Sequence, residues 1–152
     1  MTDKTLFEKI VDNEIPNWKI WEDEQFLAFL SPFPSTPGLT VVTFKKNPGA
    51  YVFELTDEQA AGLCAAAKKV ARLLEKAFDV PRVGLVFEGE GVPHVHAKLY
   101  PLHGIQSGKA AASVHFYKFY PEYPGFIDTG NGPKMSDEEL TAIQQKIRKA
   151  AE

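Results

Sequence analysis

The segment from Thr56 to Phe78 constrains the fold more than any other part of the sequence. It predicts one long helix, because Thr56 and Gln59 can form a capping box and apolar residues then recur at helical spacing. Acidic residues at 57 and 58 suit the positive end of the helix dipole. The predicted apolar face consists of Leu63, Ala67, Val70, Leu74 and Ala77. A helix with one apolar face must pack against another hydrophobic layer.

Short strands before and after this helix can supply that layer. Asp23-Glu24 and Glu88-Gly89-Glu90-Gly91 are turns short enough to join only antiparallel strands. A first helix over residues 4–14, ended by Pro16, and a last helix starting at Ser136 complete the order. We therefore predict an α+β fold, an antiparallel sheet with the long helix packed on one face. The predicted strands span residues 18–22, 26–30, 39–45, 82–88 and 92–100.

Length and composition limit the classes of protein that fit. A chain of 152 residues suits a domain over 1–102 with an extension over 103–152 packed on it. The net charge of −3, without a basic stripe, argues against a duplex nucleic-acid binder. No apolar run reaches eighteen residues and the N-terminus lacks a signal-peptide pattern, so we expect no membrane span and a cytoplasmic location. The single cysteine, Cys64, excludes an internal disulfide, and its alanine-rich helical surroundings predict a buried side chain.

Candidate chemistry concentrates in the predicted strand over residues 92–100. Side chains alternate between the two faces of a strand, so His94, His96 and Lys98 share one face with Tyr100. The intervening residues 95, 97 and 99 are apolar and suit packing against the long helix. Two imidazoles and an ammonium spaced about 7 Å apart favour binding of an anion.

An imidazole in this row can act as a nucleophile, because it is neutral near pH 7 and attacks phosphorus to form a phosphoramidate. The Gly89–Gly91 turn can bring backbone N–H groups close to phosphate oxygens. Two other readings stay open for His94 and His96. They can be a structural pair, or half of a metal site that takes a further ligand from His103 or His115.

From about Leu6 to Pro101 the chain resembles the histidine-triad superfamily of nucleotide hydrolases and transferases. The matching pieces occur in the family's order, from the opening helix to the histidine motif. They are Leu6 to Val11, Glu14-Ile15-Pro16, Trp21 to Glu24, Leu27 to Leu30, Thr36-Pro37-Gly38, Val41-Val42, Lys45-Lys46 and His94-Val95-His96.

The resemblance implies a homodimer that pairs sheet edges, with one nucleotide site per subunit and no metal or other cofactor. His96 would attack the α-phosphate, and the backbone carbonyl of His94 would hold the tautomer of this nucleophile. Water or another acceptor would then release the nucleoside monophosphate. The implied base pocket maps to Leu6, Phe7, Ile10, Phe29 and Pro32.

The sequence departs from the family pattern at several positions around the motif. Lys98 replaces the third histidine and Leu39 replaces an upstream histidine. Ser31, Gly91 and Phe87 stand where the family has a ribose-binding acid, a phosphate-binding Ser or Thr, and an asparagine. The predicted nucleotide-binding residues are therefore Leu6, Phe7, Ile10, Phe29, Ser31, Pro32, Phe87, Gly89 and Gly91, beside the catalytic residues His96, His94 and Lys98.

Two functions follow from these matches and departures. The first is an enzyme acting at the α-phosphate of a nucleotide derivative such as a dinucleoside polyphosphate, with the Lys98 ammonium holding phosphate. The second is a nucleotide-binding module that lost turnover when Lys98, Leu39 and Ser31 arose. The aromatic-rich tail over residues 115–126 is predicted to be a hydrophobic clip, with a contribution to the substrate site as the alternative.

Overall fold

The computed structural model describes residues 3–105, 121–122, 136 and 138–139. The chain divides into two compact units, Met1–Ala110 and Ala111–Glu152, and the fold and the site lie in the first. The boundary at residue 102 stays a prediction, and the aromatic residues of 115–126 lie outside the described residues. The predicted cap of the last helix is present, since the Glu139 carboxylate accepts from the Ser136 N–H at 2.9 Å. Most of that helix also lies outside the described residues.

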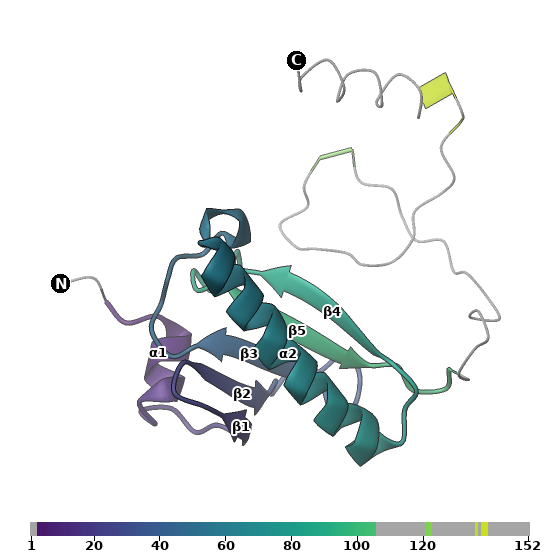
Figure 1. Cartoon of the computed structure of the whole chain (residues 1–152), viewed down its shortest axis with the longest axis horizontal. Helices are drawn as coiled ribbons and strands as arrows, with labels where there is room; N and C mark the ends of the chain where they lie inside the picture. The colour runs from purple at the N-terminus through teal and green to yellow at the C-terminus, as the bar shows by residue number, and fades with distance from the viewer. Residues whose placement is uncertain (1–2, 106–120, 123–135, 137, 140–152) are drawn as a thin grey trace. The chain divides into compact units, whose positions relative to one another are not determined.

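The first unit is an antiparallel sheet with helices α1 and α2, which confirms the predicted α+β fold (Figure 1). Neighbouring strands pair antiparallel throughout, in the order β1-β2-β3-β5-β4. The elements are α1 (Leu6–Val11), β1 (Lys19–Glu22), β2 (Phe26–Leu30), β3 (Thr40–Phe44), a 3₁₀ turn (Val52–Glu54), α2 (Asp57–Phe78), β4 (Val83–Glu88) and β5 (His96–Pro101).

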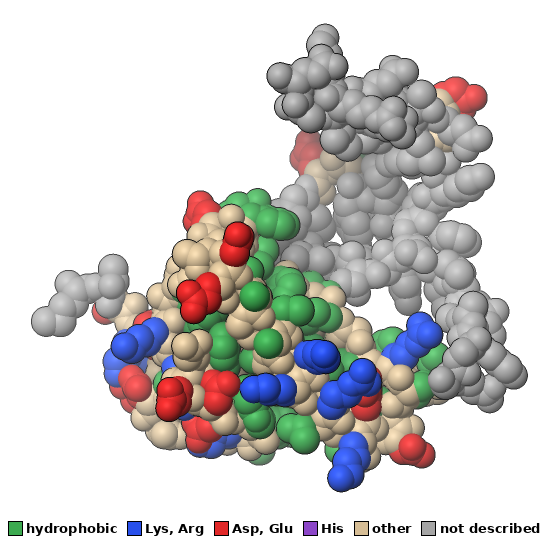
Figure 2. All heavy atoms as spheres, viewed as in Figure 1, with side chains coloured by type: hydrophobic (Ala, Val, Ile, Leu, Met, Phe, Trp, Pro, Cys, Tyr) green, Lys and Arg blue, Asp and Glu red, His purple; other side chains and the backbone are tan. Residues whose placement is uncertain are grey.

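Helix α2 covers one face of the sheet and forms the larger core with it. The predicted capping box is present: the Thr56 hydroxyl accepts from the Gln59 N–H, and the Gln59 side chain accepts from the Thr56 N–H. Viewed from the α2 side, acidic and basic side chains are interspersed with hydrophobic ones on the surface of this unit (Figure 2). The buried residues of this core are Phe26, Ala28, Val42, Phe44, Leu63, Ala66, Ala67, Val70, Leu74, Val95, Ala97 and Leu99.

Two predictions about α2 were wrong. Cys64 is exposed, because it lies one residue beyond Leu63 and therefore about 100° around the helix from the buried stripe. Ala77 is also exposed, so the buried stripe ends one turn earlier, at Leu74. Within the described residues, no helix has the combination of length and apolar character that spanning a bilayer requires.

Helix α1 lies on the other face of the sheet and is shorter than predicted. It ends at Val11 rather than at residue 14, because the chain turns away at Asn13, whose φ is +58°. Its six residues span about 9 Å, which is too short to cover the whole face. The small core here consists of Phe7, Ile10, Leu27, Phe29 and Val41.

Strand β5 begins at His96, four residues later than predicted. Pro93 has no N–H to give to a ladder, and the His94 N–H turns back to the Val92 carbonyl at 2.6 Å. The Val95 N–H donates to the Gly49 carbonyl, outside the sheet pairing. His94 therefore precedes the strand, although its ring still lies on the α1 side, 5.7 Å from the Phe7 ring centroid.

Candidate active site

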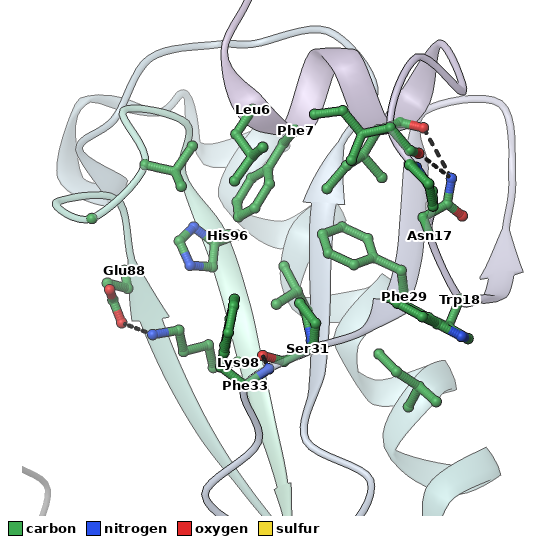
Figure 3. A pocket seen from close by; sticks show the side chains of 18 residues that line it. Leu6, Phe7, Asn17, Trp18, Phe29, Ser31, Phe33, Glu88, His96 and Lys98 are labelled. Atoms are coloured by element: carbon green, nitrogen blue, oxygen red, sulfur yellow. Dashed lines mark hydrogen bonds and ion pairs between the residues drawn. The ribbon is translucent and has the colours of Figure 1, made fainter.

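A cavity of about 510 Å³ opens beside α1, over the part of the sheet that this short helix leaves uncovered (Figure 3). This volume lies in the range of small-molecule sites. Most of the wall is apolar, and its polar groups include His96, Lys98 and Glu88. The lining residues are Leu6, Phe7, Ile10, Ile15, Pro16, Asn17, Trp18, Phe29, Leu30, Ser31, Pro32, Phe33, Val41, Glu88, Gly91, Val92, His96 and Lys98.

His96 is the candidate nucleophile at this cavity, and its side chain is only 2% exposed. Its Nδ1 lies 2.9 Å from the backbone carbonyl oxygen of His94. A carbonyl oxygen can only accept, so Nδ1 carries the proton and Nε2 keeps a free lone pair. The Phe7 ring packs edge-on against the imidazole, with centroids 4.9 Å apart, and limits its rotation. The local structure thus holds the tautomer that nucleophilic attack through Nε2 requires.

The surroundings of His96 keep its ring neutral. Burial is the largest cause that lowers the pKa of His96, and the nearby Lys98 ammonium lowers it further. The His94 carbonyl and the carboxylates of Glu88 and Glu90 act in the opposite direction, with a smaller total effect. The net result is a pKa below the ordinary histidine value of 6.5, so the neutral imidazole predominates at pH 7.

His94 connects the nucleophile to the start of α1. Its side chain is fully buried, and its Nδ1 lies 3.0 Å from the hydroxyl oxygen of Thr5. Thr5 is also the N-cap of α1, where its oxygen accepts from the Glu8 N–H. The Thr5 proton is therefore free to be donated to Nδ1 of His94. Burial lowers the pKa of His94 as well, partly opposed by the Glu8 carboxylate.

Lys98 forms an ion pair with Glu88 inside the cavity. The Nζ of Lys98 lies 2.6 Å from Oε2 of Glu88, and the two side chains are 28% and 16% exposed. Lys98 is in strand β5 and Glu88 is in the neighbouring strand β4. In the register of these strands Glu88 pairs with His96 and Val86 pairs with Lys98. The ammonium is thus already partnered by a carboxylate.

The cavity brings together most of the residues expected at the site. His96, Lys98 and seven of the nine expected nucleotide-binding residues line it. Phe87 faces away, since it pairs with Ala97 and packs with the α2 core. Gly89 is held against another loop, where an added Cβ would lie 1.8 Å from the Ala50 carbonyl oxygen. Its N–H donates to the Glu90 carboxylate at 3.0 Å.

Sequence reasoning missed several lining residues, of which Glu88 matters most chemically. Its signal was present, because a tight turn over 88–91 places Glu88 close to the histidine strand. Trp18 and Phe33 are also missed, and both rings are largely exposed at the cavity. Leu39, at the position expected for an upstream histidine, is buried.

The residues considered for a metal do not converge. His103 lies beyond the end of β5, where its Nε2 is 2.9 Å from the Pro37 carbonyl oxygen and its ring packs on Phe78. His115 lies outside the described residues. Among the described side chains, no three His, Cys, Asp or Glu groups lie close enough together to hold a metal ion.

Comparisons with known proteins point to one family. The sequence matches the HIT domain family over residues 12–116. It is 36% identical to a HIT-like protein of Methanocaldococcus jannaschii, over 94% of this chain and 98% of the relative. It is 28% identical to the adenosine 5'-monophosphoramidase of Schizosaccharomyces pombe, over 93% and 94% of the two chains. The crystal structure of a HIT family member from Bacillus subtilis superposes with a TM-score of 0.65 and 28% identity, covering 97% and 96% of the two chains.

Proposed function

The chain belongs to the HIT family, and on that premise we propose that it hydrolyses or transfers the nucleotidyl group of a nucleotide derivative through His96. The observation that carries this proposal is a buried, neutral imidazole with an unprotonated Nε2, on a residue that lines a cavity of nucleotide size. A relative named as an adenosine 5'-monophosphoramidase supports the same class of chemistry.

The proposed reaction has two displacement steps at the α-phosphorus. In the first, the Nε2 lone pair of His96 forms an N–P bond while the bond from phosphorus to the leaving group breaks, and the leaving group takes the electron pair. In the second, water or another acceptor attacks phosphorus, the N–P bond breaks, and the imidazole is restored. The His94 carbonyl stabilises the positive charge that builds up on the ring, because it accepts from Nδ1–H throughout.

The cavity walls offer a place for each part of the nucleotide. The apolar side chains of Leu6, Ile10 and Phe29 form the surface for the base, and the Phe7 ring contacts the rings of both Phe29 and His96. Ser31 is at the position for the ribose, where its oxygen accepts from the Phe33 N–H and its own proton remains available. Lys98 holds phosphate oxygens electrostatically. A dinucleoside polyphosphate and a nucleotide conjugate are the substrates we would test.

The test compares purified wild-type protein with His96→Ala on a panel of nucleotides. The panel contains a dinucleoside polyphosphate, a nucleotide sugar and a nucleoside phosphoramidate, with monophosphate release as the readout. We expect turnover by the wild type alone, together with a covalent nucleotidyl adduct on His96 detected by mass spectrometry at alkaline pH. Equal turnover by both proteins would overturn the proposed nucleophile.

A nucleotide-binding module without turnover is the second candidate. Three replacements favour it, because the family pattern has an acid at Ser31 and histidines at Leu39 and Lys98. In addition, the Lys98 ammonium is already paired with the Glu88 carboxylate. Binding of nucleotides by both proteins without release of monophosphate from any panel member would establish this function instead.

We also propose that the protein is a cytoplasmic homodimer that pairs sheet edges. Strand β4 is an edge strand of the described sheet, and its Leu85 side chain is 44% exposed. Such an edge has backbone groups that a second copy can pair with. Light scattering should give a mass near twice the 16.9 kDa of the chain, and a monomer mass would refute the pairing.

A further inference from the structure

We propose that Glu88 is a specificity-determining residue, and that it makes this pocket discriminate against nucleotides with negative charge beyond the α-phosphate. The inference rests on the proposed function, because it takes the cavity at His96 as the nucleotide site. It deepens that function by naming what selects among nucleotide derivatives.

The charge inventory of the cavity supports this role. Among the described residues that line the cavity, only Glu88 and Lys98 carry a full charge, because His96 is neutral. The two charges are opposite and lie 2.6 Å apart, so the lining has no net charge. An unpaired lysine would attract every additional phosphate, whereas the charge of Lys98 is already balanced by the Glu88 carboxylate before a nucleotide binds.

The position of the pair decides which part of a ligand it meets. Figure 3 shows the Glu88–Lys98 pair on one side of His96, with Phe29 and Trp18 on the other side. A nucleotide with its base against Phe29 and its α-phosphate at His96 therefore directs further groups toward the ion pair. A neutral group meets no opposition there, but a further phosphate meets the Glu88 carboxylate.

The size of this effect follows from Coulomb's law in a partly buried site. Both side chains are less than one third exposed, and the neighbouring walls are apolar, so water screens the carboxylate incompletely. An added negative charge close to Glu88 should weaken binding by about tenfold relative to a pocket without the carboxylate.

The test measures binding, so it does not depend on turnover. Titration calorimetry without divalent metal would give the Kd of adenosine 5'-monophosphate and of the α,β-methylene analogues of the di- and triphosphate. The readout is the ratio of the monophosphate Kd to the triphosphate Kd. In Glu88→Gln we expect this ratio to rise about tenfold over the wild type in favour of the triphosphate.

Two further variants separate selection from a general defect. Glu90→Gln removes the same charge from an exposed residue of the adjacent turn that does not line the cavity, and it should change the ratio less than twofold. Lys98→Met leaves the Glu88 carboxylate without its partner, so the ratio should move about tenfold in the opposite direction. Loss of structure alone would not move the ratio in two opposite directions.

The outcomes distinguish this inference from the proposed function. If the wild type binds the nucleotides and Glu88→Gln changes all three affinities equally, Glu88 does not determine specificity and only the inference falls. If the wild type binds none of the three, the proposed function falls and the inference falls with it.

Discussion

The two faces of the sheet are covered by helices of very different length, and this difference separates stability from function. Helix α2 has 22 residues and closes its face with a continuous apolar core. Helix α1 has six and leaves an open cavity over the rest of its face. The buried polar side chains of His94 and His96 lie on the α1 side, where Thr5 contacts His94, whereas the cluster packed under α2 consists of apolar residues. An incomplete cover therefore makes room for chemistry while the complete cover supplies stability.

The largest expected effect is on turnover and concerns the α1 face. His96→Ala removes the proposed nucleophile and should lower kcat/KM by at least about a thousandfold. The free energy of unfolding should change by less than about 2 kcal/mol, because the imidazole contributes little to the larger core. Substrate kinetics and urea unfolding of the same preparations check both numbers. A variant that retains activity, or one that fails to fold, would break the separation between the faces.

The converse change belongs to the α2 face. Leu63 is fully buried in the larger core, so Leu63→Ala should lower the free energy of unfolding by about 3 kcal/mol through lost burial and a residual cavity. Turnover per folded molecule should stay within twofold of the wild type at a temperature where both are folded. Urea unfolding gives the first quantity and active-site titration the second. A large drop in turnover at unchanged fold would show that the faces are coupled.

A pH dependence of stability should arise from the α1 face. Burial holds the pKa of His94 and of His96 below 6.5 in the folded protein, so below pH 6.5 the unfolded chain binds protons that the folded chain does not. The contribution of the two neutral histidines to the free energy of unfolding should thus be fully present above pH 6.5. It should decrease as the pH drops toward the folded pKa values, by up to about 1.4 kcal/mol per pH unit for each histidine.

Urea unfolding at pH 7.5, 6.5 and 5.5 measures this slope. The acid limb of kcat/KM should also lie below pH 6.5, because His96 must be neutral to attack. Glu8 and Glu22 have pKa values lowered from 4.5 and contribute only at more acidic pH. Stability that is flat between pH 7.5 and 5.5 would contradict neutral, buried histidines.

The smallest effect uses two matched helix caps. Thr5 and Thr56 both form capping boxes, so Thr5→Ala and Thr56→Ala should each cost about 1 kcal/mol of stability. Only Thr5 also contacts His94, so only Thr5→Ala should lower turnover of the folded protein, by several-fold. Thr5→Ser keeps the hydroxyl and should restore it. Equal turnover in the two alanine variants would limit Thr5 to capping.

The sequence predicted the elements that depend on nearby residues. The cap at Thr56, the strand Phe26–Leu30 and the placement of Ala97 and Leu99 against the long helix all agree with the structure. Capping and side-chain alternation act within a few residues, so one chain is enough to read them. Errors occurred at the ends of elements, where the backbone turns away at Asn13 and where Pro93 has no N–H to give to the strand ladder.

The site divides in the same way. The histidines, the lysine and most of the apolar wall were evident from their order along the chain, and the family resemblance gave them roles. The sequence did not indicate the ion pair between Lys98 and Glu88. It also did not indicate the contact between Thr5 and His94, which are 89 residues apart. The sequence by itself determined which groups are available and which face of a strand they share. Only the tertiary structure decided which of them meet, because strand register and helix packing join side chains that no local pattern connects.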